Sequence, residues 1–169
     1  MLMFNKHTLR TGVVLATVLA ISFTSCKNDD NDTPTPPPAR TKSFDLKGTG
    51  ADKDTKVGSI TLTENKDSSV NVVLNLTKNT KDAAHNIYLI AGTPTAVTTD
   101  TLYKGGFQGT GNALKVDIFA NVKTIKVSKP GNIQKDTAFK YDNALAIASH
   151  MKVLKGADTL AIGLFGKNN

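Results

Sequence analysis

The chain contains little of what several classes of protein require. Its 169 residues include no tryptophan and one cysteine, and aromatic residues make up only 6% of the total. The scarcity of aromatic rings disfavours binding by ring stacking, and a single cysteine cannot form an internal disulfide. No apolar run reaches the roughly 20 residues of a membrane-spanning helix, which excludes a polytopic membrane protein. With 39% hydrophobic and 21% charged residues, the composition is typical of one globular domain.

The motifs of common catalytic sites are also missing. The sequence has no Gly-x-Ser-x-Gly elbow, no phosphate-binding loop, no His-Glu-x-x-His and no cysteine pair. Glu64 is the only glutamate, and no second carboxylate is placed to act with it in glycoside hydrolysis. Loop aspartates such as Asp82 and Asp142 are usually caps and turn formers. The sequence therefore predicts a protein that is not an enzyme and that needs no cofactor.

Residues 1–25 have the pattern of an export signal. Lys6 and Arg10 precede an apolar run over residues 11–23, which is too short to span a membrane but suits the hydrophobic region of a signal peptide. The run ends in Phe23-Thr-Ser-Cys26, which resembles a bacterial lipobox, although Phe23 stands where that motif usually has a leucine-like residue. The resemblance implies that Cys26 is lipid-modified and becomes the new N-terminus. The alternative is an ordinary secretory signal followed by a buried or free thiol.

Residues 26–40 read as a linker. An acidic, asparagine-rich stretch is followed by a proline run that favours an extended, semi-rigid spacer, so we expect this segment to be disordered. Acidic residues directly after a lipidated cysteine also resemble the surface-export signals of some Gram-negative lipoproteins. We therefore expect a location in the bacterial cell envelope, anchored to the outer membrane by lipid and either exposed at the surface or facing the periplasm.

Residues 41–169 carry the alternating pattern of β-strands. Between Val70 and Leu76 the apolar residues share one face and the asparagines share the other, and Ile60 and Leu62 alternate with threonines in the same way. The turn residues 65–68 join these two runs into a predicted hairpin. Turns are predicted at Gly105-Gly106 and Pro130-Gly131. A helical turn is predicted over residues 141–145, followed by a strand that carries His150. Further strands are predicted over residues 43–47, 85–90, 100–103, 113–119, 122–127 and 159–165.

Short strands separated by glycine and proline predict the fold class. We expect an all-β domain, an antiparallel β-sandwich of immunoglobulin-like type, after the signal helix and the disordered proline-rich linker. Without cysteines in the domain, its stability must come from a packed core.

Positive charge is concentrated in one segment. Seven lysines lie between Lys104 and Lys140 against two aspartates, a net charge of +5 that equals the net charge of the whole chain after Ser25. Lys123, Lys126 and Lys129 are candidates for binding an acidic glycan or another anion. The alternative is a solvated face whose lysines protect sheet edges from pairing. Nucleic acid is not an expected partner, because the segment has no aromatic platform and no arginine cluster.

Two histidines remain after the signal, His85 and His150. If the sheet brought them together, they could begin a copper or zinc site, which would still need a third ligand. The alternative is two half-buried histidines with hydrogen-bond partners.

The order of several motifs resembles the chordin-type (CHRD) domain, a β domain of extracellular animal proteins and bacterial exported proteins. Gly58-Ser-Ile-Thr-Leu62 is similar to its first strand, and Ala84-His85-Asn86-Ile87 is similar to its Ala-His-Ile-His strand, with Ile87 in place of the second histidine. Ser149-His150 and the stretch 161–166 are similar to its late segments. The resemblance spans roughly residues 41–166 and implies a fold without an established catalytic activity.

Together these patterns predict a lipid-anchored envelope protein with a non-catalytic binding or structural domain. Its expected partners are the membrane, through the lipid on Cys26, and envelope glycans or another envelope protein. Metal binding through His85 and His150, and acidic-glycan binding through the lysine-rich segment 104–140, are the alternative functions.

Overall fold

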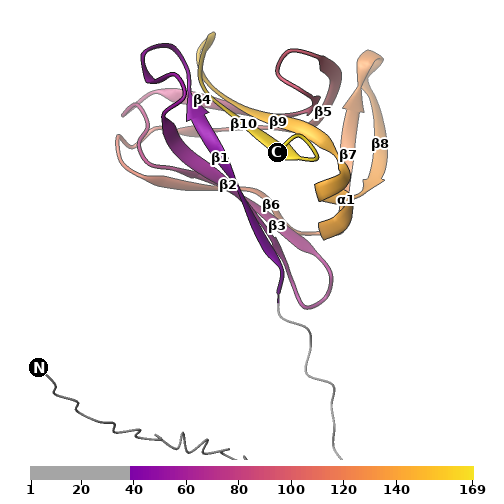
Figure 1. Ribbon diagram of the computed structural model, residues 1–169. Coiled ribbons are helices and arrows are strands. Elements are labelled where there is room, and N and C mark those ends of the chain that lie inside the picture. The colour runs from indigo at the N-terminus through magenta and orange to yellow at the C-terminus, as the bar shows by residue number, and fades with distance from the viewer. Residues whose placement is uncertain (1–38) are drawn as a thin grey trace, which may run out of the picture. The chain divides into compact units, whose positions relative to one another are not determined.

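The computed structural model describes residues 39–169, apart from the side chains of residues 97–99. Within this range ten antiparallel strands form one continuous sheet in the order β6-β3-β2-β1-β10-β9-β4-β5-β7-β8 (Figure 1). The strands are β1 (Thr41–Gly48), β2 (Lys56–Glu64), β3 (Val70–Leu76), β4 (Ala84–Gly92), β5 (Val97–Gln108), β6 (Leu114–Val122), β7 (Thr124–Lys129), β8 (Ile133–Ala138), β9 (Ala148–Lys155) and β10 (Asp158–Gly166).

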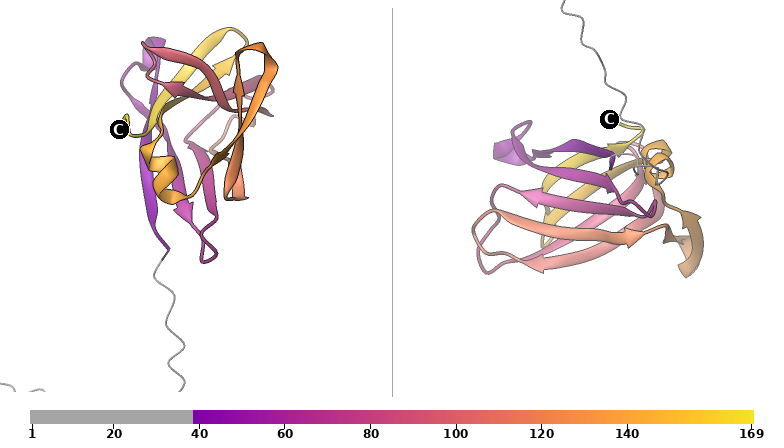
Figure 2. Two further views of the ribbon diagram at one scale, coloured as in Figure 1. Left: turned by 90° about the vertical axis from the view of Figure 1, so that its right-hand side faces the viewer. Right: turned by 90° about the horizontal axis from the view of Figure 1, so that it is seen from below.

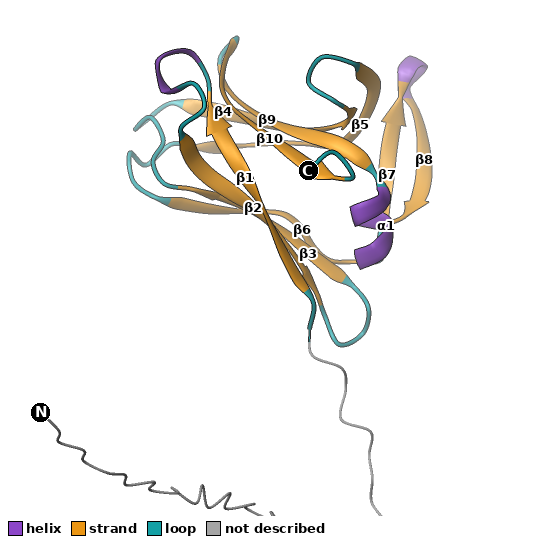
Figure 3. Ribbon diagram, viewed as in Figure 1, coloured by secondary structure: helices purple, strands orange, loops and turns teal. Residues whose placement is uncertain are grey.

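Helical structure is confined to short pieces between the strands (Figure 3). These pieces are the helix α1 (Tyr141–Ala146) and the 3₁₀ turns η1 (Gly50–Asp52) and η2 (Pro130–Asn132). None of the helices within residues 39–169 is long and apolar enough to cross a membrane. The predicted signal peptide, Cys26 and most of the predicted linker lie outside the described residues.

The sheet curls until strands that are distant in the ladder meet across the core (Figure 2). Tyr103 on β5 and Phe119 on β6 come from strands seven places apart in the sheet order, yet their ring centroids are 5.6 Å apart. Phe119 also packs edge-on against Phe139, with 5.0 Å between the centroids. The prediction of an all-β fold is confirmed. Because one ladder joins all ten strands, the division into two sheets that defines a sandwich is not confirmed.

Alternation of side chains decides which face of each strand is buried. On β2 and β3 the apolar side chains predicted to share a face, Ile60, Leu62, Val70, Val72, Leu74 and Leu76, are all buried. The asparagines between them face outward, where the Asn75 amide donates a hydrogen bond to the Thr61 hydroxyl at 3.2 Å. This alternation confirms the predicted hairpin, since β2 and β3 pair in register from Gly58–Leu76 to Glu64–Val70.

One prediction about local structure was wrong, and one strand was missed. Gly105-Gly106 does not form a turn but lies inside β5, opposite Ile87 and Asn86 of β4. A Cβ at Gly105 would overlap the Tyr103 hydroxyl, and one at Gly106 would lie 2.6 Å from the His85 carbonyl oxygen. These glycines therefore permit close approach within a strand. Strand β8 was not predicted at all, because its residues are almost all exposed and show no buried face.

Three predictions in the last third of the chain are confirmed, namely the turn at residues 130–131, the helical turn after residue 140 and the strand that carries His150. The helical turn expected over residues 141–145 is α1, and the strand that follows it, β9, carries His150. Pro130-Gly131 forms the turn between β7 and β8, where Gly131 has a φ of 77°. The β7–β8 hairpin lies at one edge of the sheet and joins it through β5.

Strand β1 connects two opposite ends of the domain. The chain enters at residues 39–41, at the foot of β1 in Figure 1, and β1 ends at Gly48. Seven residue steps at about 3.3 Å each separate these ends by roughly 23 Å. We call the end around residues 39–41 the entry end.

Candidate functional site

The structure does not bring His85 and His150 together. Strands β4 and β9 pair antiparallel, with Ile90 opposite His150 and His85 opposite Lys155. The two histidines are therefore five residues apart along the ladder, about 16 Å, and their side chains lie on opposite faces of the sheet. A shared metal ion cannot be held by two imidazoles in this arrangement. Among residues 39–169, no three His, Cys, Asp or Glu side chains gather in a way that could hold a metal.

His150 is fully buried and contacts the end of β4. Its Nδ1 lies 2.9 Å from the Gly92 carbonyl oxygen, which also accepts a hydrogen bond from the Asn168 amide at 3.0 Å. Its Nε2 has no hydrogen-bond partner. Burial lowers the pKa of His150 below 6.5, and Lys152 adds to this shift, while the hydrogen bond to Gly92 opposes it. The side chain does not line the cavity of about 590 Å³ that is described below.

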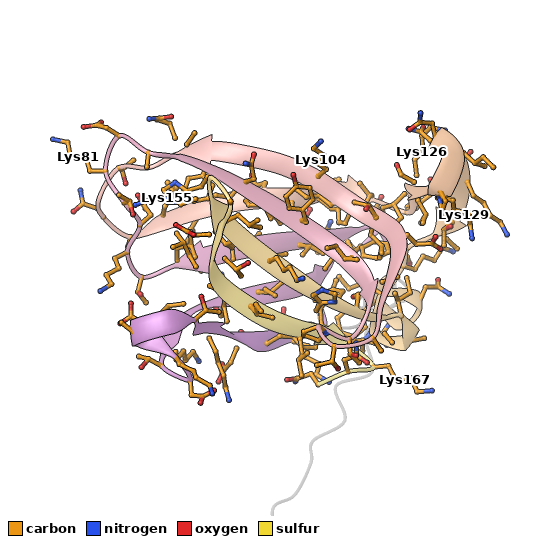
Figure 4. The ribbon with its side chains drawn as sticks, turned by 90° about the horizontal axis from the view of Figure 1, so that it is seen from above. Lys81, Lys104, Lys126, Lys129, Lys155 and Lys167 are labelled. Atoms are coloured by element: carbon orange, nitrogen blue, oxygen red, sulfur yellow. The ribbon has the colours of Figure 1, made fainter. Side chains whose placement is uncertain are left out.

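The three candidate anion-binding lysines each lie beside a carboxylate. Lys126 pairs with Asp136 at 2.9 Å, Lys129 with Asp100 at 3.2 Å and Lys123 with Asp67 at 3.2 Å. Lys126 and Lys129 extend from the β7–β8 hairpin, far from Lys81 and Lys155 on the other side of the domain (Figure 4). The charge of each of the three candidate lysines is therefore partly neutralised by a neighbouring aspartate.

Asp67 is held ionised by its own turn. The Ser69 hydroxyl donates to its carboxylate at 2.6 Å and the Ser69 amide donates at 3.1 Å. These two hydrogen bonds, followed by the contact with Lys123, lower the pKa of Asp67 to about 2. Lys123 is thus the partner of a structural turn carboxylate.

His85 occupies a different environment from His150. It is 2% exposed, on the same face of β4 as Ile87 and Leu89, and it lines a cavity of about 590 Å³. We call this the His85 cavity. Its lining residues are Thr49, Gly50, Asp52, Val57, Leu76, Lys78, Asn79, Thr80, His85, Val153, Asp158, Thr159, Leu160 and Ala161. A shallower hollow of about 400 Å³ lies between the ends of β2, β3 and β6 and holds no buried polar side chain.

The position of His85 is fixed on three sides. Its Nδ1 lies 2.8 Å from the Ala83 carbonyl oxygen, and its ring stacks on Phe107 with centroids 4.6 Å apart and planes 4° from parallel. On the third side, Gly109 approaches so closely that a Cβ there would lie 2.9 Å from His85 Cε1 and would overlap the Thr80 carbonyl oxygen. Glycine is required at position 109 for this packing.

Three loops that are far apart in the sequence form the rim of the cavity. The loop after β1 is held to β10 by Thr49, whose hydroxyl donates to the Thr159 carbonyl and whose amide donates to the Leu160 carbonyl at 3.0 Å. The loop after β3 is held by Asn79, whose side-chain oxygen accepts from the amides of Thr110 and Gly111 at 2.6 and 2.9 Å. The third loop is the β9–β10 turn with Asp158. Of the polar residues around this cavity, the sequence patterns indicated only His85 as a candidate site residue.

A second polar cluster lies at the entry end. The Arg40 guanidinium donates to both oxygens of Glu64, at 2.6 and 3.0 Å, and to both oxygens of Asp142, at 2.8 and 3.2 Å. The central carbon (Cζ) of this guanidinium group also lies 4.4 Å from the centroid of the Tyr141 ring. The hydrogen bonds from Arg40 lower the pKa of Glu64 and, with those to Asp142, raise the pKa of Arg40. The only glutamate of the chain is therefore a structural residue.

Comparisons of this chain with family models, with curated proteins and with solved structures found no match in any of the three.

Proposed function

We propose that this chain is a non-catalytic binding protein of the bacterial cell envelope, anchored to the outer membrane through a lipid on Cys26. In this proposal residues 1–25 are the signal peptide, residues 26–40 are the linker, and the domain from residue 41 carries a ligand site. The resemblance of the domain to a degenerate chordin-type fold belongs to the same proposal.

The observation that carries the proposal is the placement of the His85 cavity. The linker joins the domain at the foot of β1, whereas Thr49 and Gly50, which follow β1 directly, line the cavity at its other end. A domain tethered at its entry end would therefore present the cavity away from the membrane, where a ligand could reach it. Concave sites with a few buried polar groups are the usual form of small-molecule sites.

The two alternative functions have less support. Metal binding through His85 and His150 would require imidazoles that converge, and these lie on opposite faces of the sheet. Acidic-glycan binding through Lys123, Lys126 and Lys129 would require ammonium groups free to meet an anion, and each of them lies beside an aspartate. The cavity combines a concave shape with a lining residue that has a buried, unpartnered polar atom.

Membrane fractionation tests the anchor. The wild-type chain is expected in the membrane fraction of a Gram-negative host, and Cys26→Ser is expected in the soluble fraction. Ser25→Ala is the matched control, since it keeps a small residue before the cysteine and should remain with the membranes. A Cys26→Ser protein that still fractionates with membranes would contradict the proposal. Protease treatment of intact cells then separates a surface-exposed from a periplasm-facing domain.

A further inference from the structure

The His85 cavity contains an unused hydrogen-bonding atom. Among the described residues three buried side-chain atoms have no hydrogen-bond partner, and they are His85 Nε2, Ser149 Oγ and His150 Nε2. Of these three residues, only His85 lines the His85 cavity. Buried polar atoms without partners are rare because each one costs free energy, so such an atom beside a cavity points to a ligand that completes its hydrogen bond.

The hydrogen bond made by Nδ1 determines what Nε2 can do. A carbonyl oxygen only accepts, so the contact with Ala83 places the ring proton on Nδ1. In the neutral imidazole, Nε2 then carries a lone pair and acts as an acceptor. The ring cannot turn to change these roles, because Phe107 stacks on its face and Gly109 lies against Cε1. His85 therefore keeps a fixed hydrogen-bond acceptor that is buried beside the cavity.

The other polar groups of the cavity lining also favour a ligand that donates hydrogen bonds. The side-chain groups of Thr49 and Asn79 already form hydrogen bonds within the loops. Asp52 and Asp158 add two carboxylates, against the single ammonium group of Lys78. Carboxylates accept hydrogen bonds and repel anions, so the lining selects a neutral or cationic ligand.

Apart from Gly50, Thr80 and Thr159, the rest of the lining is apolar. Leu76, Val153 and Ala161 belong to the buried core, and Val57 and Leu160 lie beside them. This surface can cover a hydrocarbon body, and a volume of about 590 Å³ is within the range of small-molecule sites.

We propose that the His85 cavity binds a small molecule with an apolar body and one hydroxyl or ammonium group that donates a hydrogen bond to His85 Nε2. The inference deepens the proposed binding function, because it names the ligand chemistry of that same site. It does not depend on the lipid anchor, and it can therefore be tested on the soluble domain separately from membrane attachment.

A matched set of fragments tests this chemistry. Cyclohexylmethanol, cyclohexylmethylamine and cyclohexanecarboxylate share one apolar body and differ only in the polar group. Each is titrated into ¹⁵N-labelled protein from which residues 1–26 have been removed, and the imidazole nitrogen signals are followed by NMR. The alcohol and the amine are expected to move the His85 Nε2 signal in a saturable way, and the carboxylate is expected not to move it.

His150 provides the internal control. It has the same Nδ1 contact with a backbone carbonyl and the same unpartnered Nε2, but it does not line the cavity. Its nitrogen signals should stay in place during every titration. The proposal is overturned if neither donor fragment saturates the His85 signal, if the carboxylate binds as well as the alcohol, or if the signals of both histidines move together.

A substitution measures the hydrogen bond itself. His85→Leu removes the acceptor but keeps an apolar side chain of moderate size, so it should weaken the alcohol about three- to tenfold, as expected for one neutral hydrogen bond. His150→Leu should leave the affinity unchanged. Equal affinities of the wild type and His85→Leu would contradict the role of Nε2, and the titration of the unmodified protein remains decisive if His85→Leu does not fold.

Discussion

The two ends of the domain differ in whether their polar side chains have hydrogen-bond partners. At the entry end, Arg40 satisfies both Glu64 and Asp142 through four hydrogen bonds. At the other end, His85 keeps one buried acceptor without a partner beside a cavity. The polar groups of the entry end form hydrogen bonds with one another, whereas His85 Nε2 obtains a hydrogen-bond partner only when a ligand binds. Local departures from full polar satisfaction are expected where a protein functions.

His150 shows that an unpartnered atom is not sufficient by itself. Its Nε2 is as buried as that of His85, but His150 does not line the His85 cavity. The difference between the two histidines is the cavity. Changes that perturb one region at a time can break or sharpen this contrast, and the largest effect is expected where backbone atoms are most crowded.

Gly109→Ala should disrupt the cavity end most strongly. The added Cβ would overlap the Thr80 carbonyl oxygen and press on the His85 ring, and the backbone there is held by the hydrogen bonds of Gly109 with Ala83 and Asp82. We expect a loss of about 1–3 kcal/mol in the free energy of unfolding, measured by urea denaturation. Gly156→Ala is the control, because a Cβ there would meet nothing within 4 Å and only its φ of 60° is unfavourable. A smaller loss for Gly109→Ala than for Gly156→Ala would contradict this packing.

Arg40→Ala should destabilise the entry end. It leaves the half-buried Glu64 without its partner and removes the ring contact with Tyr141, so the melting temperature should fall. Lys56→Ala, which breaks the exposed pair with Asp45, is the matched control and should change little. Equal melting temperatures of the two variants would show that the Arg40 cluster contributes no more than an ordinary surface pair.

The pH dependence of stability should report on His150. Burial lowers its pKa in the folded protein below the usual histidine value of 6.5, so below about pH 6.5 the unfolded chain binds more protons than the folded one. The free energy of unfolding should therefore fall as the pH is lowered from 6.5 and level off below the folded pKa.

Denaturation with urea at pH 7.5 and pH 5.0 measures this change. His150→Leu should reduce it, while the Gly92 carbonyl keeps its hydrogen bond from Asn168. A wild type and variant with the same pH dependence would show that His150 does not titrate as its burial requires.

Replacing the lysines of the β7–β8 hairpin should have the smallest effect. Lys126→Ser and Lys129→Ser each remove an exposed ion pair, and such pairs contribute between 0 and about 1 kcal/mol. Both variants should unfold within about 0.5 kcal/mol of the wild type and should bind the donor fragments unchanged. A large loss of fragment binding would move the site from the His85 cavity to the hairpin.

Periodicity predicted those parts of the fold that have one buried and one exposed face. The β2–β3 hairpin is the clearest example, because every second residue is apolar and a turn sequence separates the runs. Strand β8 gives no such signal, since both of its faces are largely exposed. The pair Gly105-Gly106 was wrongly predicted as a turn because glycine permits both a turn and a close approach of neighbouring chains.

The candidate site was predictable only in part. A histidine after Ala84 was visible as a candidate, but the register that separates His85 from His150 depends on how β4 and β9 pair. The cavity joins residues as distant as Thr49 and Asp158, and Arg40 reaches Asp142 across 102 positions of the sequence. Contacts of this kind follow from sheet topology, which local patterns do not encode.

The claim that connects both ends is that the chain is tethered before its entry end, through Cys26. The mass of the N-terminal peptide, taken from protein extracted from the membranes of an expressing Gram-negative bacterium, tests it most directly. We expect a peptide that begins at Cys26 and carries two or three acyl chains. A peptide that begins at Met1, or one in which Cys26 is an unmodified thiol, would contradict the proposed anchor.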